Sequence, residues 1–175
     1  MRIQCGDIVL RHAEIFDAEQ LTTWWNDGEV MAHAGFPNGL GTTVEKVRAQ
    51  LGLDTDETGR RLIIEFGNDP IGEMSWRNLG DGTAEIGIKI CEISRQEKGI
   101  GRVVLSMLIG YLFDSGYTKI VLDTNLENKR AQHVYELLGF RKLRVNENAW
   151  KDQLGVLQSS VDYALTKAEF RDYSK

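Results

Sequence analysis

One segment constrains the fold more than any other: an alternating stretch that leads into a pair of glycines and then into a helix-like stripe. Residues 83–90, TAEIGIKI, alternate in the way typical of a half-buried strand. Gly99 and Gly101 follow, and apolar residues then recur at helical spacing over 100–112. This order predicts a sheet with a helix packed on it, and backbone that lies close to another group at the two glycines.

The rest of the chain predicts an α/β fold, with a mixed sheet covered by helices. Short turn sequences separate β-type runs and predict strands at 7–12, 61–66, 71–76, 83–90, 119–124, 140–145 and 156–165. Helical spacing and end signals predict helices at 17–27, 42–51, 100–115 and 128–138. Three helix starts carry N-cap signals, which are Asp17 with Gln20, Thr42 with Glu45, and Asn128. The predicted order is β-α-α-β-β-β-α-β-α-β-β.

Length and charge narrow the class of protein. The 175 residues contain two prolines and no repeat or linker-like stretch, so we expect a single domain over 1–175. The net charge of −5 argues against a nucleic-acid-binding surface and suits a cationic substrate. No apolar run is long enough to cross a bilayer and no signal peptide begins the chain, so we expect a cytoplasmic protein without a membrane partner. Two cysteines without CxxC spacing and three scattered histidines predict no metal site.

The glycine pair does not fit a dinucleotide-binding loop. Val104 stands where a third glycine would be needed, and Gly99 lies eight residues beyond Cys91, too far from the preceding strand. What remains is a helix start whose first N–H groups have no side-chain cap. Helix N-termini of this kind bind anions, and Lys98 and Arg102 add positive charge. A diphosphate would fit there.

Two motifs at this point resemble the GNAT N-acetyltransferase family. Gln96, Gly99 and Gly101 match its Q/R-x-x-G-x-G/A loop, and a second run matches its N-x-x-A-x-x-x-Y-x-x-x-G-F motif through Asn128, Ala131, Tyr135, Gly139 and Phe140. The resemblance is specific over 85–140. It implies a GNAT fold, acetyl-coenzyme A as cosubstrate and no metal. It further implies that the diphosphate lies on the loop from Gln96 to Arg102, including Ile100. The pantetheine would lie beside Ile88, Lys89 and Ile90, with Asn128 and Ala131 close by.

The same resemblance points to the groups that move protons. Tyr135 would be the acid that protonates the leaving thiolate. Two carboxylates stay open as the base. Asp123 occupies the position of an acidic residue in the aminoglycoside 6′-acetyltransferase and ribosomal-protein acetyltransferase branches, which this chain resembles most, although Thr124 replaces a proline common in the former. Glu85 occupies the position of the general base in the histone-acetylating branch.

The acceptor is the part of the function that the sequence describes least. Trp24, Trp25, Asp27 and Glu29 precede an irregular loop and combine aromatic faces with carboxylates, which suits an ammonium group. We therefore expect a small cationic amine as acceptor. Acetylation of a protein N-terminus and a non-catalytic acyl-coenzyme A-binding module are the alternatives. Trp150 would close the other wall of the site or contact a second subunit of a homodimer.

Overall fold

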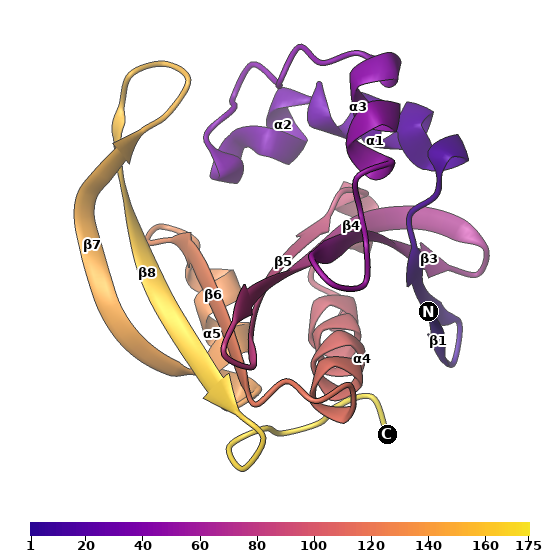
Figure 1. Cartoon of the computed structure of the whole chain (residues 1–175). Coiled ribbons are helices and arrows are strands. Elements are labelled where there is room, and N and C mark those ends of the chain that lie inside the picture. Colours follow the sequence, from indigo (N-terminus) through magenta and orange to yellow (C-terminus); the bar gives the residue numbers. More distant parts are fainter.

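An eight-stranded mixed sheet forms the centre of the molecule, as described for all 175 residues by a computed structural model (Figure 1). The strand order is β1-β2-β3-β4-β5-β6-β8-β7, and every neighbouring pair is antiparallel except β5 and β6. The strands are β1 Arg2–Cys5, β2 Ile8–His12, β3 Gly59–Phe66, β4 Asp69–Gly80, β5 Thr83–Ile90, β6 Lys119–Asn125, β7 Arg141–Lys151 and β8 Leu157–Thr166.

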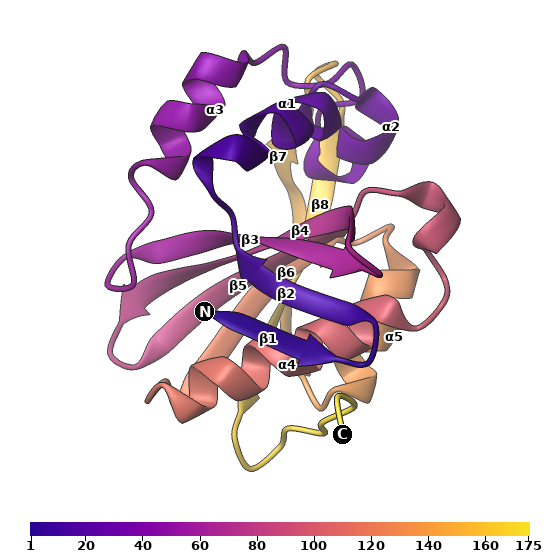
Figure 2. The ribbon, with the colours of Figure 1, turned by 90° about the vertical axis from the view of Figure 1, so that its right-hand side faces the viewer.

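Helices cover both faces of the sheet. Figure 2 shows one group above the sheet and the other below it, and we call the two sides the N-terminal face and the α4 face. The N-terminal face carries α1 Ala18–Trp25, α2 Gly28–Met31 and α3 Val44–Leu51, and the α4 face carries α4 Ile100–Asp114 and α5 Lys129–Leu137. Three 3-10 helices, η1 Ile15–Asp17, η2 Ala32–Ala34 and η3 Ile93–Arg95, complete the chain. No helix combines the length and apolar character needed to span a membrane.

Each face has its own hydrophobic core. The larger core has 25 buried residues and joins α4 and α5 to the sheet, with Leu108 and Ile120 fully buried. The smaller core has nine and joins the N-terminal helices to the sheet through Ile63. A buried aliphatic side chain contributes about 1.5–3 kcal/mol, so the larger core dominates the stability of the fold and fixes α4 firmly against the strands.

The predicted mixed α/β fold is confirmed, with one additional strand and one additional α-helix besides the three 3-10 helices. The first is β1, a four-residue strand joined to β2 through Gly6, whose φ is +58°. The second is α2, which lies in the segment expected to be irregular. Both are too short to produce a clear periodic pattern. Strands β5 and β6 and helices α4 and α5 follow the prediction within two residues.

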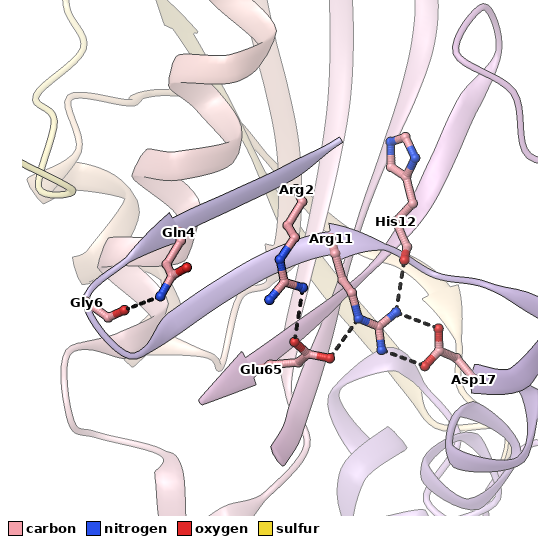
Figure 3. A network of polar contacts seen from close by, with 7 residues as sticks. All are labelled: Arg2, Gln4, Gly6, Arg11, His12, Asp17 and Glu65. Atoms are coloured by element: carbon pink, nitrogen blue, oxygen red, sulfur yellow. Dashed lines mark hydrogen bonds and ion pairs between the residues drawn. The ribbon is translucent and has the colours of Figure 1, made fainter. Parts of the chain in front are cut away.

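Two predicted helix caps are corrected. Asp17 does not cap α1, because its carboxylate accepts a hydrogen bond from the backbone of Glu14 and two from Arg11, at 2.8 and 2.9 Å (Figure 3). Arg11 also donates to Glu65 on β3 at 2.7 Å, and these partners hold its pKa above the ordinary value. Asp17 therefore ties the start of α1 to the sheet. The cap of α3 is Thr43 instead of Thr42, since the Thr43 hydroxyl accepts from the backbone of Lys46.

The sheet parts between β5 and β6. The two strands pair only from Thr83 to Glu85 on β5 and from Lys119 to Val121 on β6. Beyond these residues they diverge, as Figure 1 shows. From Ile86 to Ile90, β5 has no strand neighbour on its β6 side, so alternate backbone polar groups there have no ladder partner. The divergence leaves main chain without a strand partner in the middle of the sheet.

Candidate active site

The N-terminus of α4 lies beside this divergence and has free backbone donors. Gly99 is the N-cap residue, with φ +76°, and no side chain caps the helix. The first N–H groups of an α-helix have no intrahelical acceptor, and the helix dipole places partial positive charge there. A Cβ atom built on Gly101 would lie 4.0 Å from the nearest atom, Ile88 Cδ1. The protein itself therefore does not require glycine at 101, whereas a ligand on the helix terminus would.

Gln96 fixes the loop that precedes α4. Its amide nitrogen donates to the carbonyl of Ile90 at 2.9 Å, and its amide oxygen accepts from Arg130 at 3.1 Å. Arg130 also forms an ion pair with Glu97 at 2.9 Å. Glu97 has φ +60°, a conformation that costs a non-glycine residue about 1–2 kcal/mol. These bonds link β5, the loop and α5, and they hold the strained loop in place.

The other predicted coenzyme-binding side chains differ in burial and in their partners. Ile100 is buried in the larger core, and Ile88 and Ile90 are partly buried against it. Lys89 lies on the N-terminal face and pairs with Glu73 at 3.1 Å. Lys98 is exposed. Arg102 places its guanidinium 4.5 Å from the ring centroid of Tyr173, and its Nε atom is buried without a hydrogen-bond partner. An anion at the loop would give that buried donor an acceptor.

Helix α5 begins at its predicted cap and buries its tyrosine. Asn128 accepts a hydrogen bond from the backbone of Ala131 at 3.2 Å, and Ala131 packs at the edge of the larger core. Tyr135 is 6% exposed, with ring centroids 5.7 Å from Tyr163 and 5.9 Å from Phe140. Burial and the nearby charge of Asp123 raise the pKa of Tyr135. The phenol is therefore protonated at neutral pH, and its hydroxyl forms no hydrogen bond within the protein.

Asp123 lies on β6 just beyond the last residue that pairs with β5. Its side chain is exposed and forms no ion pair or hydrogen bond with another side chain. Partial burial raises the pKa of Asp123, and the carboxylates of Glu85 and Asp162 raise it further. Asp123 is thus an unpaired carboxylate at the divergence of the strands, close enough to Tyr135 to affect its pKa.

Both flanking carboxylates are already paired. Glu85 accepts a hydrogen bond from Arg77 at 2.8 Å. Asp162, directly opposite Asp123 on β8, accepts from Arg144 at 2.7 Å and from Asn146 at 3.1 Å. Sequence reasoning missed Asp162. The alternation of Val161, Tyr163 and Leu165 places it on the other face of its strand, but only the strand register sets it beside Asp123.

The predicted acceptor residues near α1 have partners of their own within the N-terminal face. Trp24 and Trp25 are 3% and 9% exposed within the smaller core, and their indole N–H groups donate to Glu92 and Glu73 at 3.1 and 2.8 Å. This corrects the expectation that their ring faces line an acceptor site. Asp27 caps α2 by accepting from the backbone of Glu29 and Val30. A role for Asp27 and Glu29 in acceptor binding stays a prediction.

Comparison with known proteins identifies the family of this chain. Residues 7–141 match the acetyltransferase (GNAT) domain family. The chain therefore belongs to the GNAT acetyltransferases, as its motifs predict. No match was found among curated protein sequences.

Two solved structures show how widely this fold is shared. A spermidine N-acetyltransferase from Vibrio cholerae, in complex with CoA and spermine, has a TM-score of 0.83 at 21% identity, over 94% of this chain and 98% of that one. A ribosomal L7/L12 α-N-protein acetyltransferase, RimL, in complex with coenzyme A, has a TM-score of 0.81 at 18% identity, over 95% and 98%. At these identities the likeness shows the fold alone, so the acceptor must be argued from this chain.

Proposed function

We propose that this protein is an acetyl-coenzyme A-dependent N-acetyltransferase and that its acceptor is a small cationic amine. One observation carries the proposal: Asp123 is an unpaired carboxylate where β5 and β6 diverge, beside a protonated Tyr135. A proton acceptor and a proton donor are the two groups that acyl transfer from a thioester to an amine requires.

The residues around the α4 N-terminus would hold the coenzyme. The backbone N–H groups from Ile100 to Arg102 would bind the diphosphate, and the open edge of β5 would lie along the pantetheine. The free space at Gly101 and the buried Nε of Arg102 fit an anion at this position. When bound, acetyl-coenzyme A supplies the acetyl thioester.

Asp123 would bind the ammonium form of the acceptor and receive its proton. An alkylammonium group has a pKa near 10.4, so its neutral form at pH 7 costs about 4–5 kcal/mol. A carboxylate with a raised pKa accepts a proton more readily than an ordinary aspartate. The freed amine nitrogen then forms a bond to the acetyl carbon as the carbon–sulfur bond breaks. The second proton that this nitrogen loses restores the phenol of Tyr135 after Tyr135 has protonated the sulfur, and the proton on Asp123 leaves to solvent.

Tyr135 would donate its phenolic proton to the departing sulfur. A model thiol has a pKa near 8.5, so the thiolate is a better leaving group when a donor lies beside it. Burial keeps Tyr135 protonated until that moment, and its hydroxyl is free of protein partners. The donor therefore needs no rearrangement before it acts.

The charges around Asp123 favour a cationic acceptor. Asp123 is the one member of the Asp123, Glu85 and Asp162 group whose charge no arginine balances. An ammonium group would supply that missing counter-charge and would relieve the repulsion among the three carboxylates. A neutral acceptor would leave this repulsion in place.

An amine panel scored by thiol release tests the proposal. We expect turnover with unbranched primary amines that carry a second positive charge, and weaker turnover with neutral amines of the same length. Coenzyme A binding without thiol release for any amine would reject the enzyme in favour of a non-catalytic coenzyme A-binding module. Preference for peptide N-termini over every small amine would reject the acceptor class.

A further inference from the structure

Arg102 lies in the first turn of α4, a turn that contains no acidic residue. A Cβ atom built on the N-cap residue Gly99 would lie 3.9 Å from Nη2 of Arg102, so the guanidinium lies beside the start of its own helix. A positive charge at a helix N-terminus is unfavourable, because the helix dipole is also positive there. Arg102 is therefore placed where a bound anion would relieve this repulsion.

The ring of Tyr173 holds this guanidinium. The Cζ atom of Arg102 lies over the ring at 4.5 Å from its centroid, which is within the range of a cation–π contact. A guanidinium that stacks on an aromatic face keeps its N–H groups free to bind an anion at the same time. The contact with Tyr173 therefore restricts the position of Arg102 without using up its donors.

Contacts with two helices fix Tyr173, which belongs to the stretch of chain after β8. Figures 1 and 2 show this stretch, in yellow, passing beside α4. The backbone N–H of Tyr173 donates to the hydroxyl of Ser106, a fully buried residue of α4, at 2.9 Å. The phenol of Tyr173 donates to the carbonyl of Leu137, at the end of α5, at 3.3 Å. Phe170 also packs on Phe113 of α4, with ring centroids 5.8 Å apart.

A fixed ring at this position orders Arg102 before any ligand binds. A long, mobile side chain loses torsional freedom when it binds an anion, and this loss weakens the binding. Arg102 loses part of that freedom when the protein folds, because its guanidinium already stacks on Tyr173. The cost of ordering Arg102 is therefore smaller when the anion arrives, and the affinity for the anion is higher.

We propose that Tyr173 is a positioning residue for the coenzyme: its ring holds the Arg102 guanidinium beside Gly99, where the guanidinium meets the diphosphate of coenzyme A. The proposal rests on the proposed function, in which the diphosphate binds at the N-terminus of α4. Tyr173 acts through Arg102 and takes no part in the proton transfers. Loss of its ring should therefore weaken coenzyme binding and leave kcat unchanged.

A matched pair of substitutions, Tyr173→Leu and Tyr173→Phe, isolates the aromatic ring. Both remove the hydroxyl that bonds to Leu137 and both keep an apolar side chain, but only Tyr173→Phe keeps a ring for Arg102. Calorimetry would measure the affinity of each variant for coenzyme A. We expect Tyr173→Leu to bind about 3- to 10-fold more weakly than Tyr173→Phe, which corresponds to the cost of ordering one long side chain. In steady-state kinetics, Tyr173→Leu should raise KM for acetyl-coenzyme A by a similar factor at unchanged kcat.

A double-mutant cycle with Arg102→Met separates positioning from a general effect on the fold. If Tyr173 acts through Arg102, the difference between Tyr173→Leu and Tyr173→Phe should disappear once Arg102 is methionine. If the ring at 173 only stabilises the packing of the chain on α4 and α5, the same difference should persist in the Arg102→Met protein. The cycle therefore stays decisive even when Tyr173→Leu lowers the melting temperature.

The outcomes separate the role of Tyr173 from the function on which it rests. Equal affinities of Tyr173→Leu and Tyr173→Phe for coenzyme A, or a difference that persists beside Arg102→Met, overturn the positioning role and leave the acetyltransferase intact. A wild-type protein that binds no coenzyme A overturns the proposed function first, and the positioning role with it. Coenzyme A binding with the expected cycle, but without thiol release for any amine, supports the positioning role and rejects the enzyme.

Discussion

The proposed coenzyme side and the proposed acceptor side of the site are built in different ways. The coenzyme side is made of main chain from one continuous stretch, from β5 through the Gln96 loop into α4. The proposed acceptor side is made of side chains from β4, β5, β6, β7 and β8. Gly99 and Ile100 are neighbours in the chain, whereas Asp123 and Asp162 are brought together only by the register of β6 and β8.

This difference indicates which substitutions each side tolerates. A site of backbone donors is insensitive to most side-chain changes, and it is lost when a new side chain blocks the main chain. A site of clustered carboxylates depends on each charge, because each one alters the pKa of its neighbours. Harmful substitutions on the coenzyme side should therefore be those that block the main chain, and harmful substitutions on the acceptor side should be those that remove a charge.

The largest effect is expected for Asp123→Asn. Loss of the proton acceptor should lower kcat by about 10²- to 10⁴-fold, while the affinity for coenzyme A stays unchanged. In the wild type, kcat/KM should fall as the pH drops through the raised pKa of Asp123, and this acidic limb should be missing in the variant. Steady-state kinetics across pH and calorimetry with coenzyme A would measure both.

The same substitution, Asp123→Asn, should lower activity but raise the stability of the folded protein. A carboxyl group whose pKa is raised on folding binds its proton more tightly in the folded state, so its contribution to stability decreases as the pH rises through that pKa. Asp123→Asn should therefore melt at a higher temperature than the wild type at pH 7, and the difference should shrink at acidic pH. A less active variant that also melts lower at pH 7 would indicate general damage to the fold.

The next effect is expected for Tyr135→Phe. It should lower kcat by about 10²-fold, near the lower end of the range for a general acid, because water can protonate a thiolate of ordinary pKa. The affinity for coenzyme A should change little, since Tyr135 would contact only the sulfur end. If the variant kept the wild-type rate, measured where chemistry limits turnover, the general acid would be water.

A smaller effect, confined to the coenzyme side, is expected for Gly101→Val. The new side chain meets no protein atom at its Cβ but stands where the diphosphate would approach the main chain. Coenzyme A binding should weaken at least about tenfold, or about 1.4 kcal/mol. Gly110→Val is the matched control, because Gly110 is also in α4 and its Cβ would meet nothing within 4 Å. Equal affinities in the two folded variants would show that the diphosphate lies elsewhere.

The smallest effect is expected for Glu85→Gln. Glu85 is already paired with Arg77, so turnover should fall by less than about tenfold, below the usual range for a general base. The Glu85 carboxylate raises the pKa of Asp123, and its removal should move the acidic limb of the pH profile to lower pH. A larger loss of turnover than in Asp123→Asn would transfer the role of base to Glu85.

The sequence by itself determined the segments that form the proposed coenzyme side of the site. The alternation of 83–90, the stripe of α4 and the cap at Asn128 are local patterns, and the structure follows each one within two residues. The uncapped glycine start of α4 was predicted from the same stretch and is confirmed. Such features depend on backbone conformation and on neighbours within one helical turn, which a single sequence records directly.

Only the tertiary structure decided the acceptor side. The sequence left both Asp123 and Glu85 open as the base, and the structure distinguishes them because Arg77 pairs with Glu85 and no residue pairs with Asp123. Trp24 and Trp25 are residues of a type that binds cations, but their burial against the sheet makes them core residues. The position of Asp162 beside Asp123 and the hydrogen bond from Gln153 to Gly39 depend on contacts between segments far apart in the chain. Local periodicity carries no information about strand register or the docking of a distant hairpin, because both are set by the packing of the whole sheet.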